Sequence, residues 1–308
     1  MTPAETTAPS GSVRLPFCDL NHLEVLEVGG GRARCATTAG PWLAGSDEFG
    51  IPSAAAALAD MVLMYACSTR STPGMMPVTA TLRVDLWTDP PPVGSRLVGE
   101  AEVQGADGDL LLVSGRIGVG GRTVATATIR SMLVPLVIGP GPSLPGATPV
   151  SPVAAETPHP SATPTARSSA AVPEAPTPAV DAVLALPAAV LAGMELVALG
   201  DERIDLTARP GADLERTGGV LHGGAVPLLS GLASSALLAA TIRTQQRPRR
   251  LDLTADYIRP TPMGTSLSVT STIVQRTRRL IKIHSEILDA GGRITARVYE
   301  TAALDSTA

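Results

Sequence analysis

Two runs of small and aliphatic residues dominate the hydrophobic pattern of this chain. Residues 51–67 carry a single charge, Asp60, and residues 222–240 carry none. A segment of this length that is apolar on every side is typical of a buried helix. Pro52 and Pro227 fall early in the two runs, where the first turn of a helix tolerates proline. The sequence therefore predicts two buried helices.

Strand-like segments surround both helices in the same order. Two short segments precede each helix and four alternating segments follow it, separated by glycine- and proline-rich breaks. In the first half we expect strands at 20–28, 32–38, 79–87, 96–104, 110–118 and 123–133. In the second half we expect them at 194–199, 204–208, 250–258, 266–275, 280–288 and 294–301.

The two halves form an internal repeat. Pro92-Val93-Gly94 matches Pro262-Met263-Gly264, and Gly120-Gly121-Arg122 matches Gly291-Gly292-Arg293. The helices keep the same offset to within one residue. One helix against one curved antiparallel sheet is an α+β arrangement, and two such units in one chain would pair about a pseudo-two-fold axis.

Residues 139–180 are rich in proline, alanine, serine and threonine, a composition that indicates an extended, disordered linker. Residues 1–12 are small and polar and are expected to be a disordered tail. The predicted domains are therefore residues 13–138 and 181–308. His159 lies in the linker and is not expected to function.

Composition narrows the class of protein. The 308 residues have a net charge of −4 with scattered basic residues, which argues against nucleic-acid binding. Cys18, Cys35 and Cys67 form no Cys-x-x-Cys pair, and the four histidines lack ligand spacing, so neither a disulfide framework nor a metal site is expected. No signal peptide or membrane span is predicted. We expect a cytoplasmic protein that binds neither membrane nor nucleic acid.

The second half carries a recognisable set of motifs: His222-Gly223-Gly224, Leu229 and Ala233 on the helix, then residues 253–260 (LTADYIRP) and Gly264. This set resembles the PaaI-like acyl-CoA thioesterases of the hotdog superfamily. The resemblance covers residues 194–302 and extends to residues 20–137 through the repeat. It implies a double hotdog, in which each helix is wrapped by a curved sheet and acyl-CoA sites lie between the paired helices. It also implies no cofactor beyond the coenzyme A of the substrate, and homo-oligomers of double-hotdog chains.

Each half departs from the family pattern in a different place. The pattern has an acidic residue nine positions after the histidine, where the second half has Gly231 and the first half has Asp60. The first half has Ile51-Pro52-Ser53 in place of His-Gly-Gly, and Pro52 has no N–H to donate. Along one helix the glycine and the acid lie roughly 12 Å apart, too far to act on one thioester carbon. We therefore predict one composite site, built from Asp60 and His222-Gly223-Gly224, and a dead mirror site.

The resemblance and the helix-end geometry suggest roles for these residues. The Gly223 N–H would stabilise the oxyanion, a contribution typically worth about 3–4 kcal/mol of barrier. Asp60 would act as general base or as nucleophile, and His222 would position the substrate carbonyl. The expected substrate-binding residues are Gly224, Tyr257 and, for the phosphates of coenzyme A, Arg276, Arg278 and Arg279. Residues 247–250 hold a second arginine cluster of the same kind, but either cluster is equally compatible with a solvated turn, and Tyr257 with core packing.

One alternative function remains open, and the sequence argues against two others. Because each repeat has lost half of its motif, a non-catalytic acyl-CoA-binding module is the main alternative. A hotdog dehydratase would need a histidine five residues after the acid, where this chain has Tyr65. A serine hydrolase would need a Gly-x-Ser-x-Gly elbow, which the sequence lacks.

Overall fold

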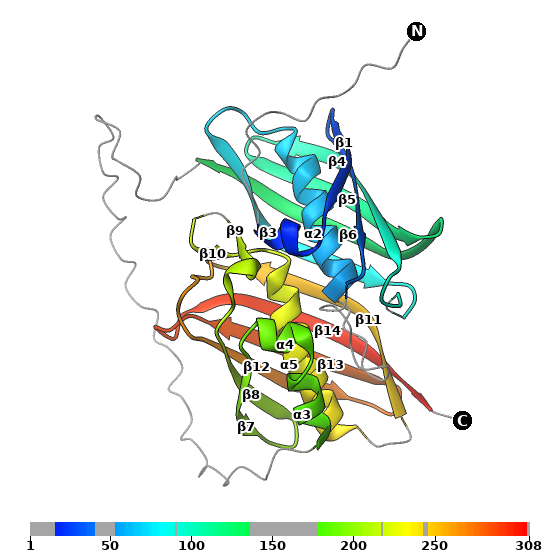
Figure 1. The fold of residues 1–308 in the computed structure, drawn as a ribbon, viewed down its shortest axis with the longest axis vertical. Helices are drawn as coiled ribbons and strands as arrows, with labels where there is room; N and C mark the ends of the chain where they lie inside the picture. The colour runs from blue at the N-terminus through cyan, green and yellow to red at the C-terminus, as the bar shows by residue number, and fades with distance from the viewer. Residues whose placement is uncertain are drawn as a thin grey trace.

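The computed structural model describes residues 16–40, 53–89, 91–135, 178–216, 218–242 and 246–306. These residues form one twelve-stranded antiparallel sheet with a long helix packed against each half (Figure 1). The strand order is β1-β2-β4-β5-β6-β3 in the N-terminal half and β11-β14-β13-β12-β8-β7 in the C-terminal half. The order is the same in both halves when each is followed from its outer edge to the centre. The predicted double hotdog fold is confirmed.

The N-terminal half consists of α1 (Pro16–Leu20), β1 (Glu24–Gly29), β2 (Arg32–Thr38), α2 (Ser53–Ser68), β3 (Met75–Leu86), β4 (Arg96–Asp107), β5 (Leu110–Val119) and β6 (Arg122–Pro135). The C-terminal half consists of α3 (Pro178–Leu184), α4 (Pro187–Leu191), β7 (Glu195–Leu199), β8 (Arg203–Ala208), a 3-10 turn η2 (Ala212–Leu214), β9 (Glu215–Arg216), β10 (Val220–Leu221), α5 (Ala225–Thr241), β11 (Gln246–Tyr257), β12 (Leu267–Arg276), β13 (Leu280–Leu288) and β14 (Ile294–Ser306).

Small residues let the central helices approach the sheet closely. In α5 all residues from Ala225 to Leu238 are buried. Under α2 the sheet has glycines instead of side chains: a Cβ on Gly99 would lie 3.0 Å from Val62, and one on Gly115 would lie 2.5 Å from a backbone oxygen and 3.2 Å from Leu63. Interiors packed to this density leave no room for an added methyl group. The apolar pattern of both helices is therefore explained by contact on every side.

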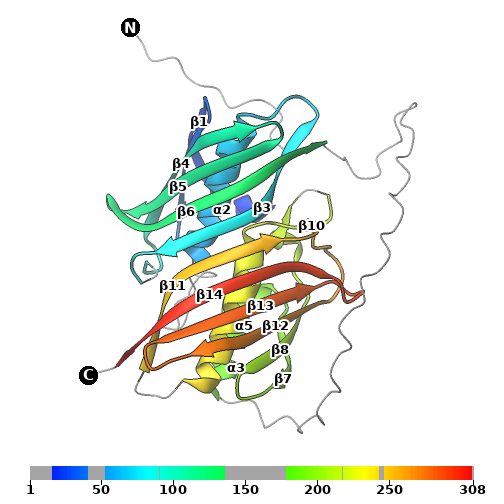
Figure 2. The same cartoon turned by 180° about the vertical axis from the view of Figure 1, so that it is seen from behind.

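The two halves join along β3 and β11, which run side by side at the centre of the sheet (Figure 2). Their antiparallel pairing extends from Asp85–Asp252 to Thr81–Asp256. Both strands contain a β-bulge, between Thr79 and Thr81 in β3 and between Arg250 and Asp252 in β11. The bulges are 171 residues apart, as are Asp60 and Gly231, which gives a structural register for comparing the halves.

Several short elements were missed in the sequence. α1 is a helix in front of the first predicted strand, which starts at Glu24 rather than at residue 20. Residues 178–180 belong to α3 rather than to the linker. These helices bury only a few side chains each, such as Phe17 in α1, so they leave little periodic signal. The tail at 1–12, the start of the first predicted helix at 51–52 and residues 139–177 of the linker lie outside the described residues. None of the described helices is long and apolar enough to cross a membrane.

Candidate active site

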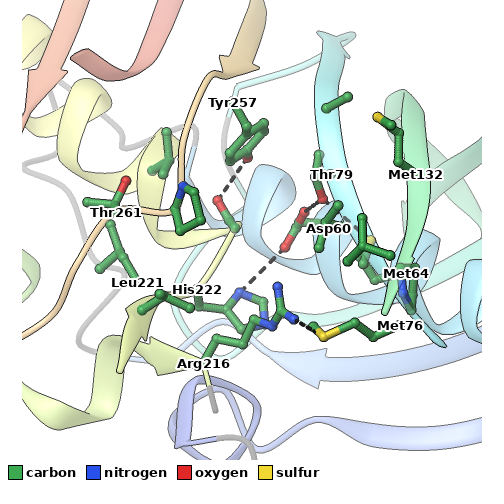
Figure 3. Close-up of a pocket in the computed structure, with 18 of the residues that line it drawn as sticks. Asp60, Met64, Met76, Thr79, Met132, Arg216, Leu221, His222, Tyr257 and Thr261 are labelled. Carbon is green, nitrogen blue, oxygen red and sulfur yellow. Dashed lines mark hydrogen bonds and ion pairs between the residues drawn. The ribbon is translucent and has the colours of Figure 1, made fainter. Parts of the chain in front are cut away.

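A cavity of about 570 Å³ lies between the two halves, where the middle of α2 faces the segment that leads into α5. The N-terminal half contributes side chains from α1, α2, β3 and β6, and the C-terminal half contributes β9, β10, the start of α5 and the end of β11. Most of the lining is aliphatic or thioether. The polar side chains deep in the cavity include Asp60, Thr79, Arg216, His222 and Tyr257. Figure 3 shows them converging on Asp60 from both halves of the chain.

Asp60 stands in the middle of α2 and is only 1% exposed. Burial raises the pKa of its carboxyl group to about 6, against the opposing effects of the Thr79 hydroxyl, the Gly224 N–H and the charge of Arg216. Thr79 on β3 donates its hydroxyl to Oδ1 at 3.3 Å. A carboxylate in this position is ionised at neutral pH yet basic enough to accept a proton, as a general base must.

His222 is held against Asp60 by the turn that precedes α5. Its Nδ1 lies 3.4 Å from Asp60 Oδ2 and accepts a hydrogen bond from the Gly224 N–H at 3.1 Å. Its ring stacks on Phe17 of α1, with centroids 4.5 Å apart. Burial, together with the nearby charge of Arg216, lowers the pKa of His222 to about 3. The imidazole is therefore neutral at physiological pH, so its contact with Asp60 is not an ion pair.

Gly223 lies directly over the Asp60 carboxylate. A Cβ added at this position would be 2.8 Å and 2.9 Å from the two carboxylate oxygens, so no other residue fits without displacing Asp60. Its carbonyl oxygen accepts a hydrogen bond from the Tyr257 hydroxyl at 2.9 Å. Its N–H donates to no acceptor in the described part of the chain. This free donor at the start of α5 points to an oxygen ligand from outside the protein.

The structure thus brings together Asp60, His222, Gly223, Gly224 and Tyr257, all five predicted from the sequence. It places the remaining predicted residues elsewhere. Arg276 donates to the carbonyl of Thr241, at the opposite end of α5 from His222, and neither Arg278 nor Arg279 lines the cavity. The arginine that lines the cavity and is exposed to solvent is Arg259.

The second arginine cluster is also accounted for by contacts within the protein. Arg247 lies 3.5 Å from Asp89, and Arg249 pairs with Asp305. Arg250 is buried, where it pairs with Glu300 and donates to the Ser235 hydroxyl. None of these contacts leaves a cluster of free guanidinium groups for phosphate.

Arg250 lies where the mirror site would be. When the halves are aligned on their two β-bulges, Gly231 corresponds to Asp60 and Arg250 corresponds to Thr79. The hydroxyl of Ser235 links the two positions, since it donates to the Gly231 carbonyl at 2.6 Å and accepts from Arg250 at 3.1 Å. Glu300 completes this buried network. The C-terminal half therefore has a structural ion pair where the N-terminal half has a carboxylate facing a cavity, and the other half of the mirror site, Ile51 and Pro52, lies outside the described residues.

Sequence reasoning missed three parts of the site. Thr79 was assigned only to a strand, and it lies at the β-bulge of β3. Arg216 lies outside every predicted strand and helix, but in the structure it lies on β9 and reaches the cavity. Four methionines line the cavity from three different elements: Met61, Met64, Met76 and Met132. Their shared role depends on strand register, which no local pattern reports. The described residues contain no group of three or more His, Cys, Asp or Glu side chains that could hold a metal ion.

Comparisons with known proteins agree with this architecture. The family model of the thioesterase superfamily matches residues 218–296, which run from the turn before α5 to β14. No curated protein matches the chain. Among solved structures, acyl-CoA thioesterase II TesB2 from Mycobacterium marinum is similar with a TM-score of 0.60 at 13% identity, covering 94% of this chain and 97% of its own. A hot dog fold protein of unknown function from Alicyclobacillus acidocaldarius has a TM-score of 0.57 at 13% identity, covering 96% and 100%. At this identity the structures establish the shared fold, and the family match is limited to residues 218–296; neither one identifies the PaaI-like subgroup.

Proposed function

We propose that this chain is an acyl-CoA thioesterase with one composite site, in which Asp60 from the N-terminal half acts on a thioester held by the turn before α5. The observation that carries the proposal is the position of the buried Asp60 carboxylate directly beneath Gly223, whose N–H has no acceptor among the described residues. A carboxylate and an N–H donor on two residues that line one cavity are the two groups that thioester hydrolysis needs.

In this proposal the thioester oxygen accepts a hydrogen bond from the Gly223 N–H. Asp60 takes a proton from water as the water oxygen attacks the carbonyl carbon. The tetrahedral intermediate then collapses, the C–S bond breaks, and the coenzyme A thiolate takes the proton back from Asp60. Thr79 holds the carboxylate by donating its hydroxyl, while His222 orders the turn by accepting the Gly224 N–H, and Tyr257 fixes the turn through the Gly223 carbonyl. The products are the free acid and coenzyme A.

The exposed Arg259 is the candidate for contact with the phosphates of coenzyme A, because it lines the cavity from the solvent side. Arg259→Ala should raise KM for acyl-CoA and leave kcat close to that of the unmodified protein. The same substitution at Arg276, at the other end of α5, is the matched control and should change neither constant.

The test of the function is release of coenzyme A from a panel of acyl-CoA thioesters, followed with a thiol reagent. We expect turnover by the unmodified protein and a loss of at least about a hundredfold in kcat for Asp60→Asn, typical of removing a general base. The rate should rise with pH through a value near 6, the pKa of Asp60. Binding of acyl-CoA without turnover would instead support a non-catalytic binding module. Full activity in Asp60→Asn would exclude the composite site.

A single turnover in ¹⁸O-labelled water would then separate the two roles of Asp60. A general base leaves the label in the released acid and none in the protein. A nucleophile passes through an anhydride, whose hydrolysis at the aspartyl carbon would put the label into Asp60.

A further inference from the structure

Arg216 is a cation in a cavity whose other walls are mostly apolar. It lies on β9 in the short β9–β10 hairpin, and the hairpin is fixed from within by the Gly219 N–H, which donates to the Glu215 carboxylate at 2.9 Å. The side chain is partly buried, and burial lowers the pKa of its guanidinium group. A buried guanidinium normally has a carboxylate partner, because removing the charge from water is costly.

No such partner exists in the described part of the chain. Arg216 forms no ion pair with any described residue, and its only hydrogen-bond acceptor there is the Met76 thioether sulfur, at 3.1 Å. Thioether sulfur is a weak acceptor. The Asp60 carboxylate is near enough for each charge to affect the pKa of the other group, but it does not pair with the guanidinium. The donors of Arg216 are thus available to a ligand.

The position of Arg216 indicates which part of a ligand it would meet. Figure 3 shows the side chain of Arg216 turned towards Met76 and Met64, whereas Tyr257 and Thr261 lie away from these methionines. The methionine side of the cavity is formed by α2, β3 and β6 of the N-terminal half. Arg259, which is exposed, comes from the end of β11 beside Tyr257. A thioester at Gly223 that extends its coenzyme A towards Arg259 would place its acyl group among the methionines, next to Arg216.

We infer that Arg216 is a specificity-determining residue that binds a carboxylate on the acyl group, so that the preferred substrates are thioesters of dicarboxylic acids rather than of plain fatty acids. This inference rests on the proposed thioesterase function and narrows its substrate class. The planar guanidinium fork suits a carboxylate in two-point contact. The thioether walls suit a methylene chain of variable length between the carboxylate and the thioester, since methionine adapts its shape readily.

The test compares acyl-CoA pairs of equal shape and different charge. Glutaryl-CoA is matched by 5-methylhexanoyl-CoA, and adipyl-CoA by 6-methylheptanoyl-CoA, because an isopropyl group replaces the carboxylate in each. We expect kcat/KM to favour the carboxylated member by about tenfold or more in the unmodified protein. Arg216→Met should abolish or reverse that preference, whereas Arg216→Lys should keep part of it. Equal effects of Arg216→Met on both members of a pair would overturn the inference and indicate that Arg216 acts on the thioester oxygen instead.

Two further experiments distinguish this inference from binding of the coenzyme A phosphates and from the proposed thioesterase function. Thioesters of the same acyl groups with N-acetylcysteamine contain no phosphates. If the preference for the carboxylated member persists with these thioesters, it depends on the acyl carboxylate. If it disappears, it depends on coenzyme A, and the inference is refuted. Calorimetry with thioether analogues, which cannot be hydrolysed, tests recognition without catalysis. Selective, Arg216-dependent binding of the carboxylated analogue in a protein that hydrolyses no thioester would support the inference while rejecting the proposed function. Hydrolysis of thioesters without any preference for the carboxylate would do the reverse.

Discussion

Replacing Asp60 by asparagine should stabilise the folded protein while removing its activity. The folded-state pKa of Asp60 is about 6, above the value of 3.8 for the free side chain, so folding favours the protonated carboxyl. The stability associated with this group is fully present below pH 3.8 and is lost as the pH rises through 6. Asparagine is neutral throughout and has nearly the same shape. Linkage between these two pKa values predicts that the variant gains about 2 kcal/mol over the unmodified protein at pH 5 and about 3 kcal/mol at pH 8.

The assay is urea unfolding of both proteins at pH 5, 6.5 and 8. The free energies of unfolding extrapolated to zero urea are compared where the two proteins have equal m-values. Asp205→Asn is the matched control, since the pKa of Asp205 is lowered in the folded protein, with Arg203 and Thr270 as its stabilising partners. That variant should therefore be less stable than the unmodified protein at neutral pH, and the deficit should shrink as the pH falls. A pH-independent difference for Asp60→Asn, or one that shrinks towards pH 8, would refute the reasoning from burial.

Three further substitutions test the site and its mirror image. Gly223→Ala places a methyl group within 2.9 Å of the Asp60 carboxylate and should lower kcat about a hundredfold, as measured by coenzyme A release. Thr79→Val removes a hydrogen bond that lowers the pKa of Asp60, so the rising limb of the pH–rate profile should move to higher pH. Glu300→Gln leaves Arg250 buried without its charged partner and should cost about 3–5 kcal/mol in unfolding free energy with little change in kcat.

Each substitution has its own control. Gly105→Ala, in open space on β4, should leave kcat unchanged, so that a loss equal to that of Gly223→Ala would point to general misfolding. Thr79→Ser keeps the hydroxyl and should restore the original pH profile. A Glu300→Gln protein with normal stability but reduced turnover would contradict the assignment of the Arg250–Glu300 pair as purely structural.

The fold was predictable because its main signals are local and repeated. Two all-apolar helices, matching glycine turns and a proline-rich separator mark the two halves in the sequence. The constant offset between matching residues shows which segments of the two halves correspond. The approach of Asp60 to His222 and Gly223 across the two halves could also be predicted, because the residues that each half lacks are visible in the sequence. Short elements such as α1 could not be predicted, since five residues carry no helical period, and yet α1 supplies Phe17 beneath His222.

The remaining errors have one physical origin. Thr79, Arg216 and Met76 meet in the cavity through β3 and the β9 hairpin, and only the register of the sheet decides which side chain faces Asp60. The same limit explains Arg276. A cluster of arginines in a turn looks identical from sequence whether it lies at the mouth of a cavity or, as here, at the far end of α5.

The buried Arg250–Glu300 pair has a consequence for how such a protein can evolve. In a homodimer of single hotdog chains every substitution appears in both sites at once, so a change that ruins one site ruins its twin. Joining the two copies in one chain removes that symmetry. Gly231 and Arg250 can then become part of the core while their counterparts, Asp60 and Thr79, stay at the cavity. Each half can then specialise. The C-terminal half keeps the turn before α5 at the cavity and turns the middle of its helix into core, while the N-terminal half bears the energetic cost of the buried Asp60 charge.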